Sequence, residues 1–64
     1  MPIIRIEMLP GRSQQQKDDL IKAMTESMAD IAKTSTEAVH VIITETAAEH
    51  WGIGGQTIAA TQKK

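Results

Sequence analysis

The sequence predicts one α/β domain, in which a long helix joins two parallel strands and a short hairpin follows near the C-terminus. Three observations predict it: an alternating stretch at residues 2–9, an amphipathic stretch at 14–33, and an apolar, β-branched stretch at 39–45. A strand, a crossover helix and a second strand of the same sheet form a right-handed β-α-β unit. With 64 residues, the chain makes a single domain that spans residues 1–64.

The first predicted strand, residues 2–9, differs between its two faces. Isoleucine and methionine at the even positions alternate with the charged residues Arg5 and Glu7. This period of two is typical of a strand with one apolar face. Pro10 and Gly11 then supply turn residues, so we expect the strand to end there.

The predicted helix begins with a capping box. The Ser13 hydroxyl can accept from the N–H of Gln16, and the Gln16 side chain can reach back to the N–H of Ser13. An apolar stripe then recurs at helical spacing, which is typical of a helix packed on a sheet and not of a ligand set. The stripe comprises Leu20, Met24, Met28 and Ile31. We expect the helix to run from about Gln14 to Lys33, close to ~30 Å.

The second predicted strand, residues 39–45, is more apolar than the first, which suits a central strand covered on both faces. A glycine-rich segment at residues 52–55, around Trp51 and Ile53, predicts a turn or short hairpin. The tail, residues 57–64, is short, and we interpret it as one edge strand.

Composition predicts an oligomer. The chain has no Cys, Phe or Tyr and a single Trp, and a domain this small buries a limited core. His40 and His50, ten residues apart, fit no structural zinc pattern. Disulfides and structural metals are thus excluded, and assembly remains as the means of stabilising the fold.

The charge pattern excludes some partners. The net charge of −1 comes from well-mixed acidic and basic residues, which does not resemble a nucleic-acid footprint. The apolar runs are too short to cross a membrane, and the N-terminus lacks the features of a signal peptide. We therefore expect a cytoplasmic protein with neither nucleic-acid nor membrane partners.

The start of the chain, Met1-Pro2, can generate a base. A small second residue permits removal of the initiator methionine, which leaves Pro2 with a secondary amine. An α-amine titrates near ~7.7–8.0 in model peptides, and an apolar or cationic environment lowers that pKa. A neutral amine near pH 7 can abstract a proton next to a carbonyl. Many chains begin with Met-Pro without such a role, and a retained Met1 leaves the Pro2 nitrogen as a non-basic amide.

Four segments occur in order along nearly the whole chain: PII at residues 2–4, LPGRS-x-x-QK at 9–17, VIITE at 41–45 and HWGIGG at 50–55. Together they resemble the 4-oxalocrotonate tautomerase family. The resemblance implies β-α-β subunits that pair into dimers, three of which form a hexamer. It also implies cofactor-free tautomerisation, in which the N-terminal proline moves a proton between carbons of an unsaturated 2-oxo acid through a dienol.

The resemblance assigns roles to individual residues. Pro2 corresponds to the general base and acid, and Arg12 to an arginine that binds a substrate carboxylate with its planar fork of donors. Trp51 matches an aromatic position lining the pocket, where it would exclude water and keep the amine neutral. From the residues alone, Arg12 is first of all a solvated turn residue near a helix start, whereas Trp51 suits the core or a subunit interface as well as a pocket.

His40 stands where many members of that family carry a second arginine. An imidazole is not permanently charged and cannot grip a carboxylate with a fork. Three functional interpretations stay open: a single hydrogen bond to the substrate carbonyl in a slower or pH-dependent enzyme, a substrate with one carboxylate held by Arg12, or a second type of subunit that supplies the arginine. His40 is otherwise a polar residue on a half-exposed strand.

We therefore expect an isomerase, a tautomerase of small 2-oxo or enol acids, with Pro2 as base and Arg12, His40 and Trp51 in substrate binding. It needs no metal or cofactor and forms a homohexamer, with a hetero-oligomer as the variant. The alternatives are a hydratase, dehalogenase or decarboxylase of the same superfamily, and a non-catalytic subunit of an oligomer.

Overall fold

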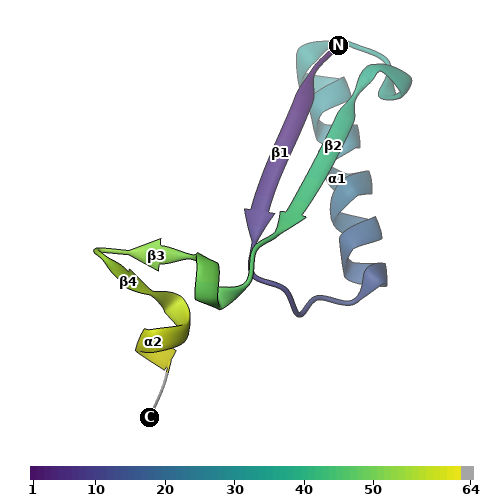
Figure 1. The fold of residues 1–64 in the computed structure, drawn as a ribbon. Helices are drawn as coiled ribbons and strands as arrows, with labels where there is room; N and C mark the ends of the chain where they lie inside the picture. Colours follow the sequence, from purple (N-terminus) through teal and green to yellow (C-terminus); the bar gives the residue numbers. More distant parts are fainter. Residues whose placement is uncertain (63–64) are drawn as a thin grey trace.

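The computed structural model describes residues 1–62 and shows the expected β-α-β unit (Figure 1). Strand β1 (Ile3–Met8) leads into helix α1 (Gln14–Ala32), and strand β2 (His40–Glu45) follows. The two strands are parallel, and α1 lies behind the sheet on the side of β2 in Figure 1. The predicted β-α-β unit with a parallel strand pair is confirmed, with each strand slightly shorter than predicted.

The β1–β2 sheet is covered on one face only. Its register runs from Ile3 opposite His40 to Met8 opposite Glu45. The even-numbered side chains of β1 are half-buried towards α1, and the odd-numbered ones are exposed on the other face. The expectation that β2 is central and covered on both faces is wrong for the single chain, because β2 pairs with β1 alone in the described residues and Ile42 is 40% exposed.

Helix α1 starts as its sequence predicts. The N–H of Gln16 donates to Ser13 Oγ over 3.1 Å, and the N–H of Ser13 donates to Gln16 Oε1 over 2.9 Å. The helix ends one residue earlier than expected because Lys33, with φ 58° and ψ 51°, is in the left-handed region and caps it. Of the predicted apolar stripe, the first three residues are half-buried, whereas Ile31 is 78% exposed.

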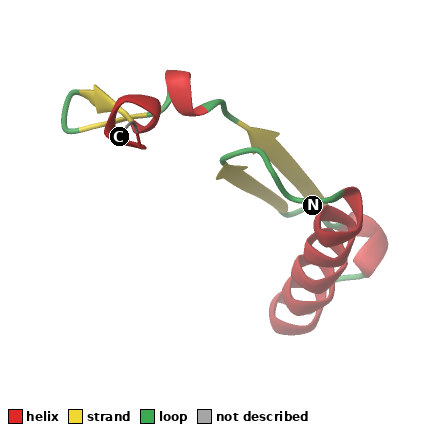
Figure 2. Ribbon diagram, turned by 90° about the horizontal axis from the view of Figure 1, so that it is seen from below, coloured by secondary structure: helices red, strands yellow, loops and turns green. Residues whose placement is uncertain are grey.

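The last described part of the chain is a C-terminal arm, residues 48–62. It contains the 3-10 turn η2 (Ala48–His50), the hairpin β3 (Gly52–Ile53) and β4 (Gln56–Thr57), and helix α2 (Ile58–Gln62). The predicted short hairpin is confirmed, and its turn uses two glycines at positive φ. The arm lies beyond the C-terminal ends of β1 and β2, away from α1 (Figures 1 and 2).

The interpretation of the tail as an edge strand is wrong for the described residues. Residues 58–62 form α2, because the Thr57 hydroxyl accepts from the N–H of Ala60 over 3.1 Å, as an N-cap residue does. The N–H of Ile58 donates to the carbonyl of Trp51 over 2.7 Å and ties α2 back to the hairpin. Residues 63 and 64 lie outside the described residues.

The single chain does not close a core of its own. Its radius of gyration is 15.1 Å, whereas a compact chain of this length has about 11 Å. It exposes 4893 Å², against about 4,000 Å² for a compact folded monomer of this mass. No side chain within residues 1–62 is fully buried. The apolar faces of the fold are therefore only half covered by the chain itself.

Among the described residues, no helix combines the length and apolarity that a membrane crossing requires.

Candidate active site

Pro2 and His40 lie together at the start of the two parallel strands. The backbone N–H of His40 donates to the carbonyl of Pro2 over 3.0 Å, which continues the pairing of β1 with β2 by one residue. Pro2 is half-buried, and His40 is exposed. Met1 is 82% exposed, so the bond between Met1 and Pro2 is open to solvent in the single chain. The strand register thus brings together two of the four site residues expected from sequence.

The same end of the sheet has apolar surroundings. An open hollow of about 250 Å³ lies between β1 and the C-terminal half of α1. It is lined by Ile4, Met24, Ser27, Met28 and Ile31. Ile4 is the next residue after Pro2 on the half-buried face of β1. The hollow therefore gives this end of the sheet an apolar lining beside β1.

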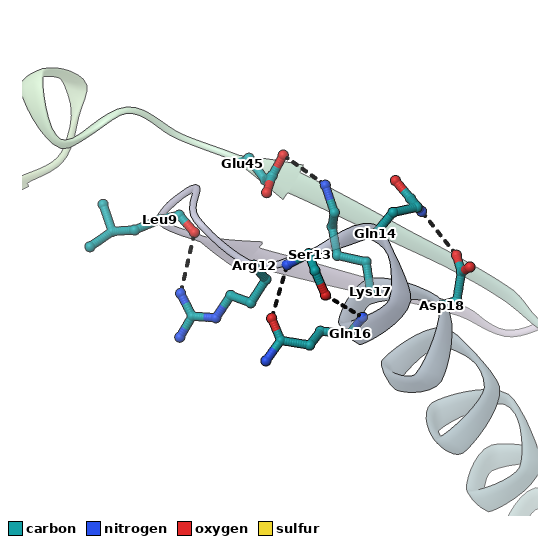
Figure 3. A network of polar contacts seen from close by, with 8 residues as sticks. All are labelled: Leu9, Arg12, Ser13, Gln14, Gln16, Lys17, Asp18 and Glu45. Carbon is teal, nitrogen blue, oxygen red and sulfur yellow. Dashed lines mark hydrogen bonds and ion pairs between the residues drawn. The ribbon is translucent and has the colours of Figure 1, made fainter.

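Arg12 lies at the opposite end of β1, in the loop of residues 9–13 that leads to α1. Its side chain is exposed, and Nη1 donates to the carbonyl of Leu9 over 3.4 Å (Figure 3). The remaining N–H donors of its guanidinium have no partner within residues 1–62. Gly11 precedes it with φ 129°, a conformation that favours glycine. Arg12 therefore presents free donors suited to a carboxylate.

Trp51 also lies beyond the ends of the strands. It is half-buried at the start of the C-terminal arm, where its backbone N–H donates to the carbonyl of Ala48 over 3.4 Å. A six-residue strand such as β1 is about 20 Å long. The single chain thus places Pro2 and His40 at one end of the sheet and Arg12 and Trp51 at the other, and does not bring all four together.

Sequence reasoning did not find the ion pair between Lys17 and Glu45. Lys17 Nζ lies 3.2 Å from Glu45 Oε1, and it is the only ion pair within residues 1–62. The two residues are 28 positions apart, so no local sequence motif predicts their contact. Only the packing of α1 on β2 brings them together, beside the loop that carries Arg12.

The sequence model of the family described as "Tautomerase enzyme" matches residues 2–61. The chain therefore belongs to the tautomerase family, whose members are isomerases, and the resemblance noted from its motifs is confirmed. It is 40% identical over 63 residues to a 2-hydroxymuconate tautomerase of Pseudomonas putida. The aligned region covers 98% of this chain and 100% of that protein.

Solved structures show the same fold. TomN, a 4-oxalocrotonate tautomerase homologue of the tomaymycin biosynthetic pathway, has a TM-score of 0.90 and 39% identity, covering 95% of this chain and 94% of that one. A heterohexamer 4-oxalocrotonate tautomerase from Chloroflexus aurantiacus J-10-fl has a TM-score of 0.86 and 37% identity, covering 92% and 95%. The β-α-β subunit with its short hairpin is thus a shared architecture.

Proposed function

We propose that this chain is the subunit of a cofactor-free tautomerase that acts on small unsaturated 2-oxo or enol acids, with the amine of Pro2 as general base and acid. The observation that carries the proposal is the position of Pro2. Its carbonyl is held by the N–H of His40 at the start of the sheet, while its nitrogen is joined only to the exposed Met1. Removal of Met1 therefore frees an amine on a fixed backbone.

The chemistry follows from that amine. The neutral nitrogen of Pro2 takes a proton from a carbon next to the substrate carbonyl, and the electron pair of the broken C–H bond moves into the conjugated system, which becomes a dienolate with its negative charge on the carbonyl oxygen. The resulting ammonium returns the proton to another carbon of the conjugated chain. No oxidant, metal or bound group is consumed, because the proton moves within one substrate molecule.

Arg12, His40 and Trp51 have supporting roles in this proposal. The free donors of Arg12 bind a substrate carboxylate with paired charge-assisted hydrogen bonds. His40 donates one side-chain hydrogen bond to the 2-oxo group beside Pro2. Trp51 covers the site and excludes water, which favours the neutral amine.

The complete site requires more than one subunit. Pro2 and Arg12 lie at opposite ends of a strand about 20 Å long, so one chain cannot supply both to a single small substrate. The elongated shape and the exposed apolar residues support assembly. We therefore propose dimers and a hexamer of three dimers, in which Pro2 of one subunit meets Arg12 and Trp51 of a neighbour.

A mixed oligomer is the second candidate. His40 provides no fork for a carboxylate, and a related structure at 37% identity is named as a heterohexamer. In a mixed oligomer, a different subunit supplies a permanently charged residue to the site. The present chain then either contributes Arg12 or has no catalytic role. Co-purification with a second short chain from native cells distinguishes this candidate from a homohexamer.

Two measurements test the proposed function. Intact mass spectrometry of native protein should show the loss of one methionine residue. An ultraviolet assay of that protein should then detect turnover of enol acids such as phenylenolpyruvate and of unsaturated 2-oxo acids. The activity should fall about 10²- to 10⁴-fold in Pro2→Ala, which retains an amine of different basicity and geometry. Full turnover by that variant, or by protein that retains Met1, would remove Pro2 from the mechanism.

A further inference from the structure

We infer that the Lys17–Glu45 ion pair is a positioning element for Arg12; this rests on the proposed function, in which Arg12 binds the substrate carboxylate. Lys17 lies in the first turn of α1, and Glu45 is the last residue of β2. Their side chains meet over 3.2 Å and remain only 21% and 31% exposed. The pair is therefore partly shielded from water at the end of the sheet where Arg12 lies.

The pair joins the two ends of the Arg12 loop. Glu45 stands opposite Met8 in the strand register, and Met8 is the last residue of β1, directly before the loop. Lys17 follows one helical turn after Ser13, where the loop ends, and its backbone N–H donates to the carbonyl of Ser13 over 3.1 Å. The contact between the side chains of Lys17 and Glu45 thus links the two anchors of the loop, in addition to the packing of α1 on β2.

Little else restrains the loop from within. Gly11 adopts a positive φ, and the hydrogen bond from Arg12 to the Leu9 carbonyl is long, at 3.4 Å, and exposed. The capping box fixes Ser13 to α1 but does not relate α1 to the sheet. A change in the distance between the two anchors of the loop would therefore move Arg12.

Lys17 does not act as a second substrate cation in this arrangement. In Figure 3 its side chain reaches up to Glu45, whereas Arg12 extends away from that pair. Its ammonium is already neutralised by a carboxylate. The role of the pair is therefore geometric, and reversing its two charges should preserve it.

The test uses four variants of the full chain with a verified N-terminus: Lys17→Met, Glu45→Gln, the double variant of these two, and the swapped pair Lys17→Glu with Glu45→Lys. Lys22→Met is the matched control, because Lys22 is an exposed lysine of the same helix with no ion pair within residues 1–62. A partly exposed pair contributes little to stability, so all variants should keep the wild-type circular dichroism spectrum.

Kinetics with a carboxylate-bearing enol acid should separate binding from chemistry. Each single variant should raise KM about 3- to 10-fold with kcat within about twofold, because a displaced anchor weakens binding without touching the proton transfer. The double variant should be no worse than the poorer single variant, and the swapped pair should return KM to within about twofold of wild type. A swapped pair as impaired as Lys17→Met, or a Lys22→Met variant equally impaired, overturns the inference.

An NMR readout makes the test independent of catalysis. In the free protein, the amide signals of residues 9–13 and the Nε–Hε signal of Arg12 should shift or broaden in both single variants. They should recover in the swapped pair and stay unchanged in Lys22→Met. Loop signals that do not respond to loss of the pair refute the inference, even if the enzyme is active. A loop that responds in a protein without tautomerase activity supports the positioning role and refutes the proposed function instead.

Discussion

Replacing His40 by arginine should increase turnover of a dicarboxylate 2-oxo acid. His40 is exposed at the first position of β2, and its backbone N–H already binds the Pro2 carbonyl over 3.0 Å. The longer guanidinium therefore displaces no core side chain and stays beside the proposed base. It adds one charge-assisted hydrogen bond, which contributes about 1.5–3 kcal/mol. Because the position is open to solvent in the single chain, we expect the lower part of this range, a gain of about 10- to 30-fold in kcat/KM.

The assay compares kcat/KM for a dicarboxylate and a monocarboxylate 2-oxo acid at pH 7.5 and at two ionic strengths. The gain should be larger for the dicarboxylate, and high salt should reduce it. Thr44→Arg is the control, since it adds the same charge to the same exposed face of β2 but away from Pro2. An equal gain in Thr44→Arg, or no gain in His40→Arg, would refute the placement of His40 beside the reacting carbonyl.

Three further changes test other parts of the structure. Arg12→Gln should raise KM for a carboxylate substrate about 10- to 100-fold with little change in kcat, because a neutral amide forms no charge-assisted pair; an unchanged KM in steady-state assays argues against this anchor. Ser13→Ala should cost about 1 kcal/mol in thermal unfolding at fixed protein concentration, because it removes the helix cap, whereas Ser35→Ala, at a position without a side-chain cap bond, should cost less. Equal losses would contradict that difference. Ile31→Glu should shift sedimentation towards smaller species, because Ile31 is 78% exposed at an apolar hollow, while Lys22→Glu should sediment as wild type. An unchanged distribution for Ile31→Glu places that face outside the assembly contact.

Much of the fold was predictable because its signals are local. The period of two in β1, the apolar stripe of α1 and the reciprocal bonds of Ser13 and Gln16 depend on residues within a few positions of each other. The tail was harder for the opposite reason, since residues 57–64 have no clear period. The Thr57 hydroxyl ahead of Ile58 and two alanines is the one signal in this segment that favours a helix.

The sequence predicted which residues belong to the candidate site but not where they lie relative to one another. Pro2, Arg12, His40 and Trp51 came from motifs and family resemblance, which carry no distances. The structure shows that strand register puts Pro2 beside His40, and that the length of β1 separates both from Arg12. That separation is what makes assembly a requirement of the proposed chemistry.

Local sequence signals specify the order and type of the main elements, the helix start and the glycine turn. Tertiary structure alone decided that β2 has an open face, that Ile31 is exposed, and that Lys17 meets Glu45. Turns, caps and periodicity depend on residues that are close together in the sequence, and these features can therefore be predicted from it. Register, layer order and ion pairs across 28 residues are set by how complete elements pack on one another.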